Sequence, residues 1–273
     1  MARPVAPKKA DSPTKPDGIT RISVAGFKSI VEEQSIEVRP LTILAGANSS
    51  GKSSIMQPLL LLKQTLEASY DPGALRLDGP NVRFTSAEQF LSQVGRGKHT
   101  DVFSVGIEAG GSGYLTTYFR KQPGKAIEVQ QNTFIRGNSK RELRVDMAPD
   151  EIRSNVGSVF LQFITDDVGK EPEIAVTRNR FFLGFLFNRR GGQRGIDTTT
   201  VIPAQVIEHY IRDTIHIPGL RGNPERTYVV AAVGKTFPGT FEPYAASVIA
   251  KWQAENDDNL EGVSQDLKEL GLT

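Results

Sequence analysis

Cysteine is absent from the 273 residues of the chain. Without cysteine the protein has no disulfide framework, no catalytic thiolate and no zinc site with cysteine ligands. The sequence also lacks the run of roughly 20 apolar residues that a membrane-spanning helix needs, and its N-terminus has no apolar core of a secretory signal. We therefore expect a soluble, cytoplasmic protein with no membrane partner.

Net charge and histidine are also scarce. Lysine plus arginine number 33 and aspartate plus glutamate 31, so no whole-molecule field favours a nucleic-acid partner, although a local basic stripe remains compatible with the sequence. The three histidines, His99, His209 and His216, show no metal-ligand spacing, which favours surface or packing positions. Apolar residues make up 38% of the chain, enough for a buried core.

The chain begins with a segment that has little to bury. Residues 1–18 contain four prolines and charges of both signs, so we expect a disordered tail there. From Thr20 onward apolar and polar residues alternate, around Ile22 and Val24 and again around Ile36 and Val38. This period of two predicts two half-buried strands.

The next segments predict a buried strand, a turn and a helix. Residues 41–45 (LTILA) are almost continuously apolar, as in a strand covered on both faces, and Gly46 begins a turn. The following helix should be kinked at Pro58, which lacks a backbone donor. Its apolar stripe comprises Ile55, Leu59, Leu62 and Leu66, widened by Met56, Leu60 and Leu61, with Gln57, Lys63, Gln64 and Glu67 outside it.

The rest of the chain reads as mixed β and α. Residues 75–145 consist of short β segments broken by glycine and asparagine, including 101–107 and 114–119, which predicts an antiparallel region. Further strands are expected at 158–164 and 181–187, and helices near 204–212, 242–253 and 263–270.

One motif carries recognisable chemistry. GANSSGKS at residues 46–53 matches G-x-x-x-x-G-K-[ST] between an apolar segment and an amphipathic helix. Glycines let the backbone N–H groups and the helix N-terminus approach phosphates, Lys52 would reach the β- and γ-phosphates, and the Ser53 hydroxyl would bind Mg²⁺. The predicted site for ATP and Mg²⁺ consists of Gly46, Ala47, Asn48, Ser49, Ser50, Gly51, Lys52, Ser53 and Ser54, with Lys52 as the catalytic group and Ser53 as the metal ligand.

Together with the segment ISVAGFKS at residues 22–29, this motif resembles the opening of RecF, SMC and OLD-type ATPases. The segments QPLLLLKQ (57–64) and LDGPNVRF (77–84) are similar to a bacterial group of AAA-labelled, ABC-like ATPases, some of which, such as the Septu type, act in phage defence. IPGLRGNPERTY at 217–228 is similar to a further stretch of that group.

The resemblance implies an α/β P-loop NTPase fold: the N-terminal lobe of an ABC-type ATPase head over residues 19–273, with an antiparallel β subdomain. It would place Phe27, Lys28 and Ser29 near the base or α-phosphate of the nucleotide; the alternative is an ordinary β-turn. It would place Arg221 and Arg226 near the lobe interface; the alternative is a salt-bridged loop.

A complete head also needs a second half that is not apparent in the sequence, in which an apolar strand ends in Asp-Glu and positions magnesium and the attacking water. Asp166 and Asp167 are the nearest imitation; their alternative is an ordinary strand ending in a turn. Residues 190–194 (RGGQR) are similar to the GGQ of transporter signature loops. The other interpretations are a solvated hairpin or a basic turn that touches a phosphate backbone, with Arg178, Arg180, Arg189, Arg190 and Arg194. Gln89 or Gln93 is a candidate for the glutamine that bridges magnesium and the far lobe.

These features predict a head lobe that binds ATP without efficient turnover, in a bacterial antiviral-defence or DNA-transaction ATPase. The expected partners are a second head, in a homodimer or hetero-complex, a nuclease effector, and nucleic acid as a candidate. Hydrolysis would need a missing or partner-supplied half. The alternatives are a non-catalytic ATP sensor that controls assembly and, less favoured, a small-molecule kinase that uses the same loop.

Overall fold

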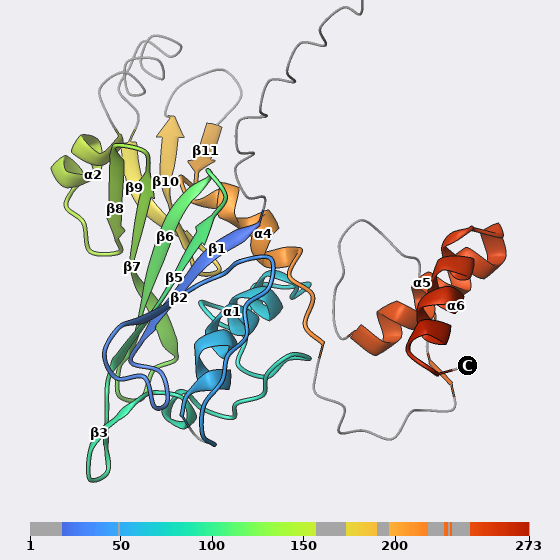
Figure 1. Ribbon diagram of the computed structural model, residues 1–273. Coiled ribbons are helices and arrows are strands. Elements are labelled where there is room, and N and C mark those ends of the chain that lie inside the picture. Colours follow the sequence, from blue (N-terminus) through green and yellow to red (C-terminus); the bar gives the residue numbers. More distant parts are fainter. Residues whose placement is uncertain are drawn as a thin grey trace, which may run out of the picture.

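The computed structural model describes residues 18–48, 50–156, 173–189, 197–217, 227–228, 230 and 241–272. Figure 1 shows their arrangement, which is mixed α/β. Several predicted features lie outside these residues: positions 1–17 of the tail expected at 1–18, the strand at 158–164 with Asp166 and Asp167, the segment 190–194, and Arg221 and Arg226.

A six-stranded sheet forms the centre of the fold. Its strand order is β2-β1-β5-β6-β7-β8, and every neighbouring pair is antiparallel. The antiparallel region predicted within 75–145 is therefore confirmed, and the two strands predicted at the N-terminus join the same sheet. The strands are β1 (Ile19–Ala25), β2 (Gln34–Glu37), β5 (Val102–Ala109), β6 (Gly113–Lys121), β7 (Ile127–Arg136) and β8 (Ser139–Arg144).

One face of this sheet is apolar because the strand registers align buried side chains across it. Val24 lies opposite Val105, which lies opposite Thr117, then Asn132 and Leu143, and all five are buried. Alternate residues on each strand point to the same face, so this row continues with its neighbours into one core.

A second, three-stranded antiparallel sheet packs against the β7–β8 end of the first. It consists of β9 (Glu173–Asn179), β10 (Phe182–Arg189) and β11 (Asp197–Val201), with β10 in the middle, and includes the strand predicted at 181–187. The Asn132 side chain fixes the junction: its amide nitrogen donates to the Phe181 carbonyl at 3.2 Å and its oxygen accepts the Leu183 N–H at 2.6 Å. A buried amide with its hydrogen bonds made specifies one docking position for the two sheets.

Helix α1 (Lys52–Leu66) packs on β1 and on α4 (Glu208–Arg212); it contains the whole predicted apolar stripe, with Pro58 inside it. Other predicted helices are present as η2 (Gln205–Ile207) with α4, as α5 (Phe241–Glu255) and as α6 (Asn259–Glu269), which packs on α5. The remaining described elements are α2 (Pro149–Val156), η1 (Ala87–Gln89) and a hairpin of β3 (Gln93–Gly95) and β4 (Lys98–His99). No helix in the described ranges is long and apolar enough to cross a membrane.

The strand predicted at 41–45 is not formed, and the prediction that it is covered on both faces is wrong. The segment has no regular structure, with Leu41 79%, Ile43 78% and Leu44 36% exposed. No strand in the described part of the chain pairs with this segment. Strand β2 is the edge of the sheet there and has β1 as its one strand neighbour among the described residues. An apolar run predicts burial but does not supply the layer that buries it.

Candidate functional site

The loop at residues 46–53, called the phosphate loop below, connects the exposed segment 41–45 to the N-terminus of α1. Gly51 is the residue before the helix and has φ 94°, a left-handed conformation that favours glycine. A Cβ atom at Gly51 would lie 3.0 Å from the Ser29 hydroxyl oxygen, and one at Gly46 would lie 2.8 Å from that of Ser50. Both glycines therefore fit a loop whose main chain is wound tightly, as a phosphate cradle requires.

Lys52 bends back over this loop. Its Nζ donates hydrogen bonds to the carbonyl oxygens of Gly46, at 2.7 Å, and Ala47, at 2.6 Å. The loop is closed by a further bond from the Ser50 N–H to the Ala47 carbonyl at 3.3 Å. An ammonium group held at the loop by two neutral carbonyls can exchange them for phosphate oxygens with a gain in charge attraction.

The N-terminus of α1 is open to an anion. No side chain caps it and no acidic residue lies in its first turn, so the first amide groups have neither a capping oxygen nor a repelling carboxylate in front of them. Such a terminus favours negative charge. Asn48, Ser50 and Ser53 are exposed, whereas Ser54 is buried; the predicted site residue Ser49 lies outside the described residues.

Magnesium would take its ligands chiefly from the nucleotide. Within the described ranges no group of three His, Cys, Asp or Glu side chains is arranged to hold a metal. Ser53 is an exposed hydroxyl at the second position of α1, next to Lys52. One hydroxyl ligand combined with phosphate oxygens and waters is a common way for Mg²⁺ to bind.

The segment at residues 27–30 forms a turn beside the loop. Phe27 and Ile30 exchange two backbone hydrogen bonds, each 2.9 Å, which agrees with the β-turn interpretation. Ser29 faces the phosphate loop at Gly51. Phe27 is fully buried and stacks on Phe90, with ring centroids 5.3 Å apart, so its ring belongs to the core and is not exposed for base stacking.

Lys28 is the strained residue of this turn. Its φ is 50°, a left-handed value that costs a non-glycine residue about 1–2 kcal/mol. Its Nζ lies 5.0 Å from the centroid of the Phe84 ring, and partial burial lowers the pKa of its ammonium group. The side chain is thus bound to an aromatic face instead of reaching for the loop.

The distal half of α1 contains two buried polar residues that lie outside its apolar stripe. Lys63 and Gln64 are both 0% exposed, so a position outside the stripe is not a position in solvent here. Lys63 donates to the Arg212 carbonyl at the end of α4 (2.6 Å) and pairs with Glu67 (2.5 Å). Burial is tolerated because the charge has both an acidic partner and a carbonyl acceptor.

Gln64 holds the loop at residues 76–82. Its amide nitrogen donates to the carbonyls of Arg76 (2.6 Å) and Val82 (3.1 Å), and its oxygen accepts the N–H groups of Asn81 (3.3 Å) and Val82 (3.0 Å). Gly79 lies flat on this amide, since a Cβ there would be 2.5 Å from the Gln64 Cδ. Two of the segments that carry the family resemblance, 57–64 and 77–84, therefore contact each other directly.

The other sequence candidates have ordinary structural positions. Gln89 bonds locally to the Thr85 N–H (2.9 Å), and Gln93 is exposed at the base of the β3–β4 hairpin. Arg178 pairs with Asp71 at 2.9 Å and Arg180 donates to the Ala68 carbonyl, so neither forms a free basic turn. The side chains of Arg189, Arg190 and Arg194 are not among those described.

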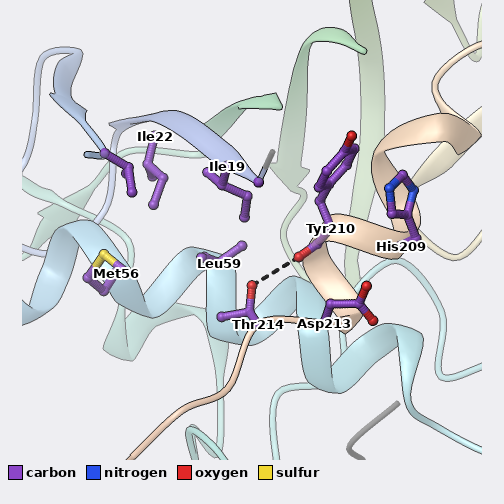
Figure 2. A pocket seen from close by; sticks show the side chains of 10 residues that line it. Ile19, Ile22, Met56, Leu59, His209, Tyr210, Asp213 and Thr214 are labelled. Carbon is purple, nitrogen blue, oxygen red and sulfur yellow. Dashed lines mark hydrogen bonds between the residues drawn. The ribbon is translucent and has the colours of Figure 1, made fainter. Parts of the chain in front are cut away.

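The histidines are not gathered together. His99 bonds to the Leu91 carbonyl at 2.9 Å, His216 contacts the Asn81 side chain at 3.3 Å, and the ring of His209 lies on that of Tyr210. His209 and Tyr210 belong to the wall of a pocket of about 490 Å³ between β1, α1 and α4, shown in Figure 2. The pocket is lined on its β1 and α1 sides by the apolar side chains of Ile19, Ile22, Met56 and Leu59.

Exposed apolar residues follow two of the pocket residues along the chain. Val38 lines the pocket three residues before Leu41, and Thr214 lines it immediately before Ile215, which is 50% exposed. Figure 2 shows Ile19, Ile22 and Met56 on one side of the pocket and His209 and Tyr210 of α4 on the other.

No family model matches the chain, and a search of curated proteins finds no significant match.

Proposed function

We propose that the chain binds Mg-ATP through the phosphate loop, as the lobe of an ABC-type ATPase head. The observation that carries the proposal is Lys52, whose ammonium group lies on the Gly46 and Ala47 carbonyls directly before an uncapped helix N-terminus. The tight glycine conformations and the G-x-x-x-x-G-K-[ST] spelling support it.

Each residue of the loop has a specific part in this proposal. The backbone N–H groups of the loop and of the first turn of α1 hold the β-phosphate, and the Lys52 ammonium moves from the carbonyls to the β- and γ-phosphate oxygens. Ser53 gives its hydroxyl to Mg²⁺, which supplies charge neutralisation between the β- and γ-phosphates. Ser29, in the 27–30 turn, packs beside Gly51 and leaves little room for a side chain at that position of the loop.

Hydrolysis in this proposal needs a missing or partner-supplied half. The sequence has no apparent apolar strand ending in Asp-Glu, and no carboxylate cluster stands at the loop among the described residues. The exposed apolar segment 41–45 and the pocket beside α1 support a second half that packs over them as a further layer. Once covered, segment 41–45 would have the apolar residues on both faces that are typical of a central parallel strand. The covering layer would carry the catalytic carboxylate.

The biological setting follows from the resemblance in residues 22–29, 46–54 and 57–84. We place the chain in a bacterial defence or DNA-transaction ATPase in the cytoplasm, where ATP closes two heads and hydrolysis reopens them. A nuclease effector is the candidate partner. The alternative function is a non-catalytic ATP sensor, which the lack of an apparent catalytic carboxylate favours.

Binding and turnover separate these functions. We expect a fluorescent ATP analogue with Mg²⁺ to bind the wild-type chain and to lose at least tenfold in affinity in Lys52→Ala, with Lys125→Ala, an exposed lysine away from the loop, as the matched control. Phosphate release that depends on Lys52 in the isolated chain would exclude the sensor. Binding without release would favour the sensor or the incomplete head, and transfer to a small acceptor would favour a kinase.

A further inference from the structure

The β3–β4 hairpin is a basic finger that stands clear of the rest of the protein. Residues 93–99 are all exposed, and Figure 1 shows the hairpin projecting beyond the end of the central sheet. A Cβ added at Gly95 or Gly97 would meet no atom within 4 Å. The backbone at the tip is therefore accessible from both sides.

Two unpaired cations occupy this tip. Within the described residues, no hydrogen bond or ion pair to the side chain of Arg96 or Lys98 is present, and residues 89–100 contain no aspartate or glutamate. Two cations at the end of β6 are instead paired, because Arg120 pairs with Asp101 at 3.1 Å and Lys121 with Glu88 at 3.4 Å. The uncompensated charge is concentrated on the finger.

The base of the finger is firmly attached beside the phosphate loop. The Thr100 N–H donates to the Ser92 carbonyl (2.8 Å), and the Ser92 N–H donates to the Gly26 carbonyl (2.9 Å). The Lys28 N–H donates to the Phe90 carbonyl (2.6 Å). These bonds connect the finger to the 27–30 turn, whose Ser29 lies against Gly51.

We propose that this finger, through Arg96 and Lys98, binds the phosphodiester backbone of a nucleic acid. Two mobile cations separated by glycine satisfy phosphate contacts, which need charge and access more than a shaped pocket. An acidic protein surface is less favoured, because Val94 is the only apolar side chain on the finger and a protein interface needs an apolar centre. The inference deepens the proposed function but depends on it only for the link to the ATP loop.

The size of the effect follows from counterion release. Each phosphate neutralised on duplex DNA contributes about −0.9 to the slope of log K against log salt, so losing two contacts should reduce the slope by about 1.8. At 0.15 M salt this corresponds to a loss of about thirtyfold in affinity, which vanishes toward 1 M salt. For single strands the expected change in slope is about 1.4.

The test is fluorescence anisotropy with labelled 30-nucleotide random-sequence DNA, as duplex and as single strand, on the full chain. The double variant Arg96→Ala/Lys98→Ala should show the reduced slope, whereas Lys125→Ala/Arg136→Ala, which removes the same charge from exposed sites elsewhere, should bind like the wild type. Lys52→Ala should also keep DNA binding, so the DNA experiment can be interpreted even if the chain does not bind ATP.

Three results would overturn the proposal: no DNA binding by the wild-type chain, equal losses in the two double variants, or competition by polyglutamate at the same charge concentration as DNA. If Arg96→Ala/Lys98→Ala loses more affinity for the duplex than for the single strand, or the reverse, the comparison shows which form of DNA the finger binds. Because the finger contributes no core residue, both double variants should keep the wild-type urea midpoint, and this measurement shows that each is folded.

Discussion

Replacing Gln64 by alanine removes four of the hydrogen bonds that fasten the 76–82 loop to α1, and leaves the bond from the Arg76 N–H to the Thr65 hydroxyl at 2.9 Å. Two of them, to the N–H and carbonyl of Val82, are fully buried, and two, to Arg76 and Asn81, are partly buried. After the substitution the Val82 N–H remains buried without a partner, whereas the Val82 carbonyl keeps the Gly79 N–H at 3.2 Å. A buried group left unsatisfied costs about 1–3 kcal/mol, so the loss of the bond to the Val82 N–H alone is expected to cost about 1–3 kcal/mol.

A loss of this size is a large part of the 5–15 kcal/mol that typically stabilises a domain. Urea denaturation followed by far-UV circular dichroism measures it as a lower midpoint with an unchanged slope. The matched control is Gln89→Ala, because Gln89 is exposed and bonds only to Thr85. We expect the control to lose no more than about 1 kcal/mol. A Gln64→Ala variant within about 0.5 kcal/mol of the wild type would refute the reasoning about this buried amide.

Three further predictions concern stability and association. Gly79→Ala should destabilise the chain by about 1–3 kcal/mol in the same urea assay, because the new Cβ meets the fixed Gln64 amide, whereas Gly95→Ala should stay within about 0.5 kcal/mol. Arg178 lowers the pKa of Asp71 from 3.8, so the pair stabilises the fold above that pH and its contribution disappears as the pH falls through the lower folded value. Asp71→Asn should therefore give a flatter stability profile below pH 3.8, with an effect under about 1 kcal/mol for this exposed pair; an unchanged acid profile would contradict the assignment. Ile43→Lys should leave the urea midpoint unchanged but reduce self-association in sedimentation velocity, since the side chain is 78% exposed; a lower midpoint would mean that Ile43 is packed.

Local patterns in the sequence predicted the elements that have a regular apolar period or that pair with a neighbouring segment of the chain. The alternation around Ile22 and Val24 identified β1, and the helical stripe from Ile55 to Leu66 identified α1. The antiparallel region followed from short β segments separated by turn residues, because hairpin pairing depends on neighbours in sequence. The motif at residues 46–53 could be found in the sequence for the same reason, because its residues are neighbours and its spacing is fixed.

Long-range burial was not predictable from those patterns. Lys63 and Gln64 fall outside the apolar stripe of α1, yet each is buried against a segment that lies elsewhere in the chain. The paired polar residues in an otherwise apolar helix, together with the glycine at 79, were the signal available. The opposite error occurred at residues 41–45, where apolar composition predicted a covered strand but no described strand pairs with it.

The measurement that tests the central proposal most directly is isothermal titration calorimetry of the full chain with Mg-ATP up to millimolar concentration. The structure leads us to expect a saturable heat for the wild type and for Lys125→Ala. It leads us to expect no saturation in that range for Lys52→Ala, because the ammonium group that bridges the loop is gone. No heat of binding for the wild type, or equal binding by Lys52→Ala, would contradict the proposal that residues 46–53 hold a nucleoside triphosphate.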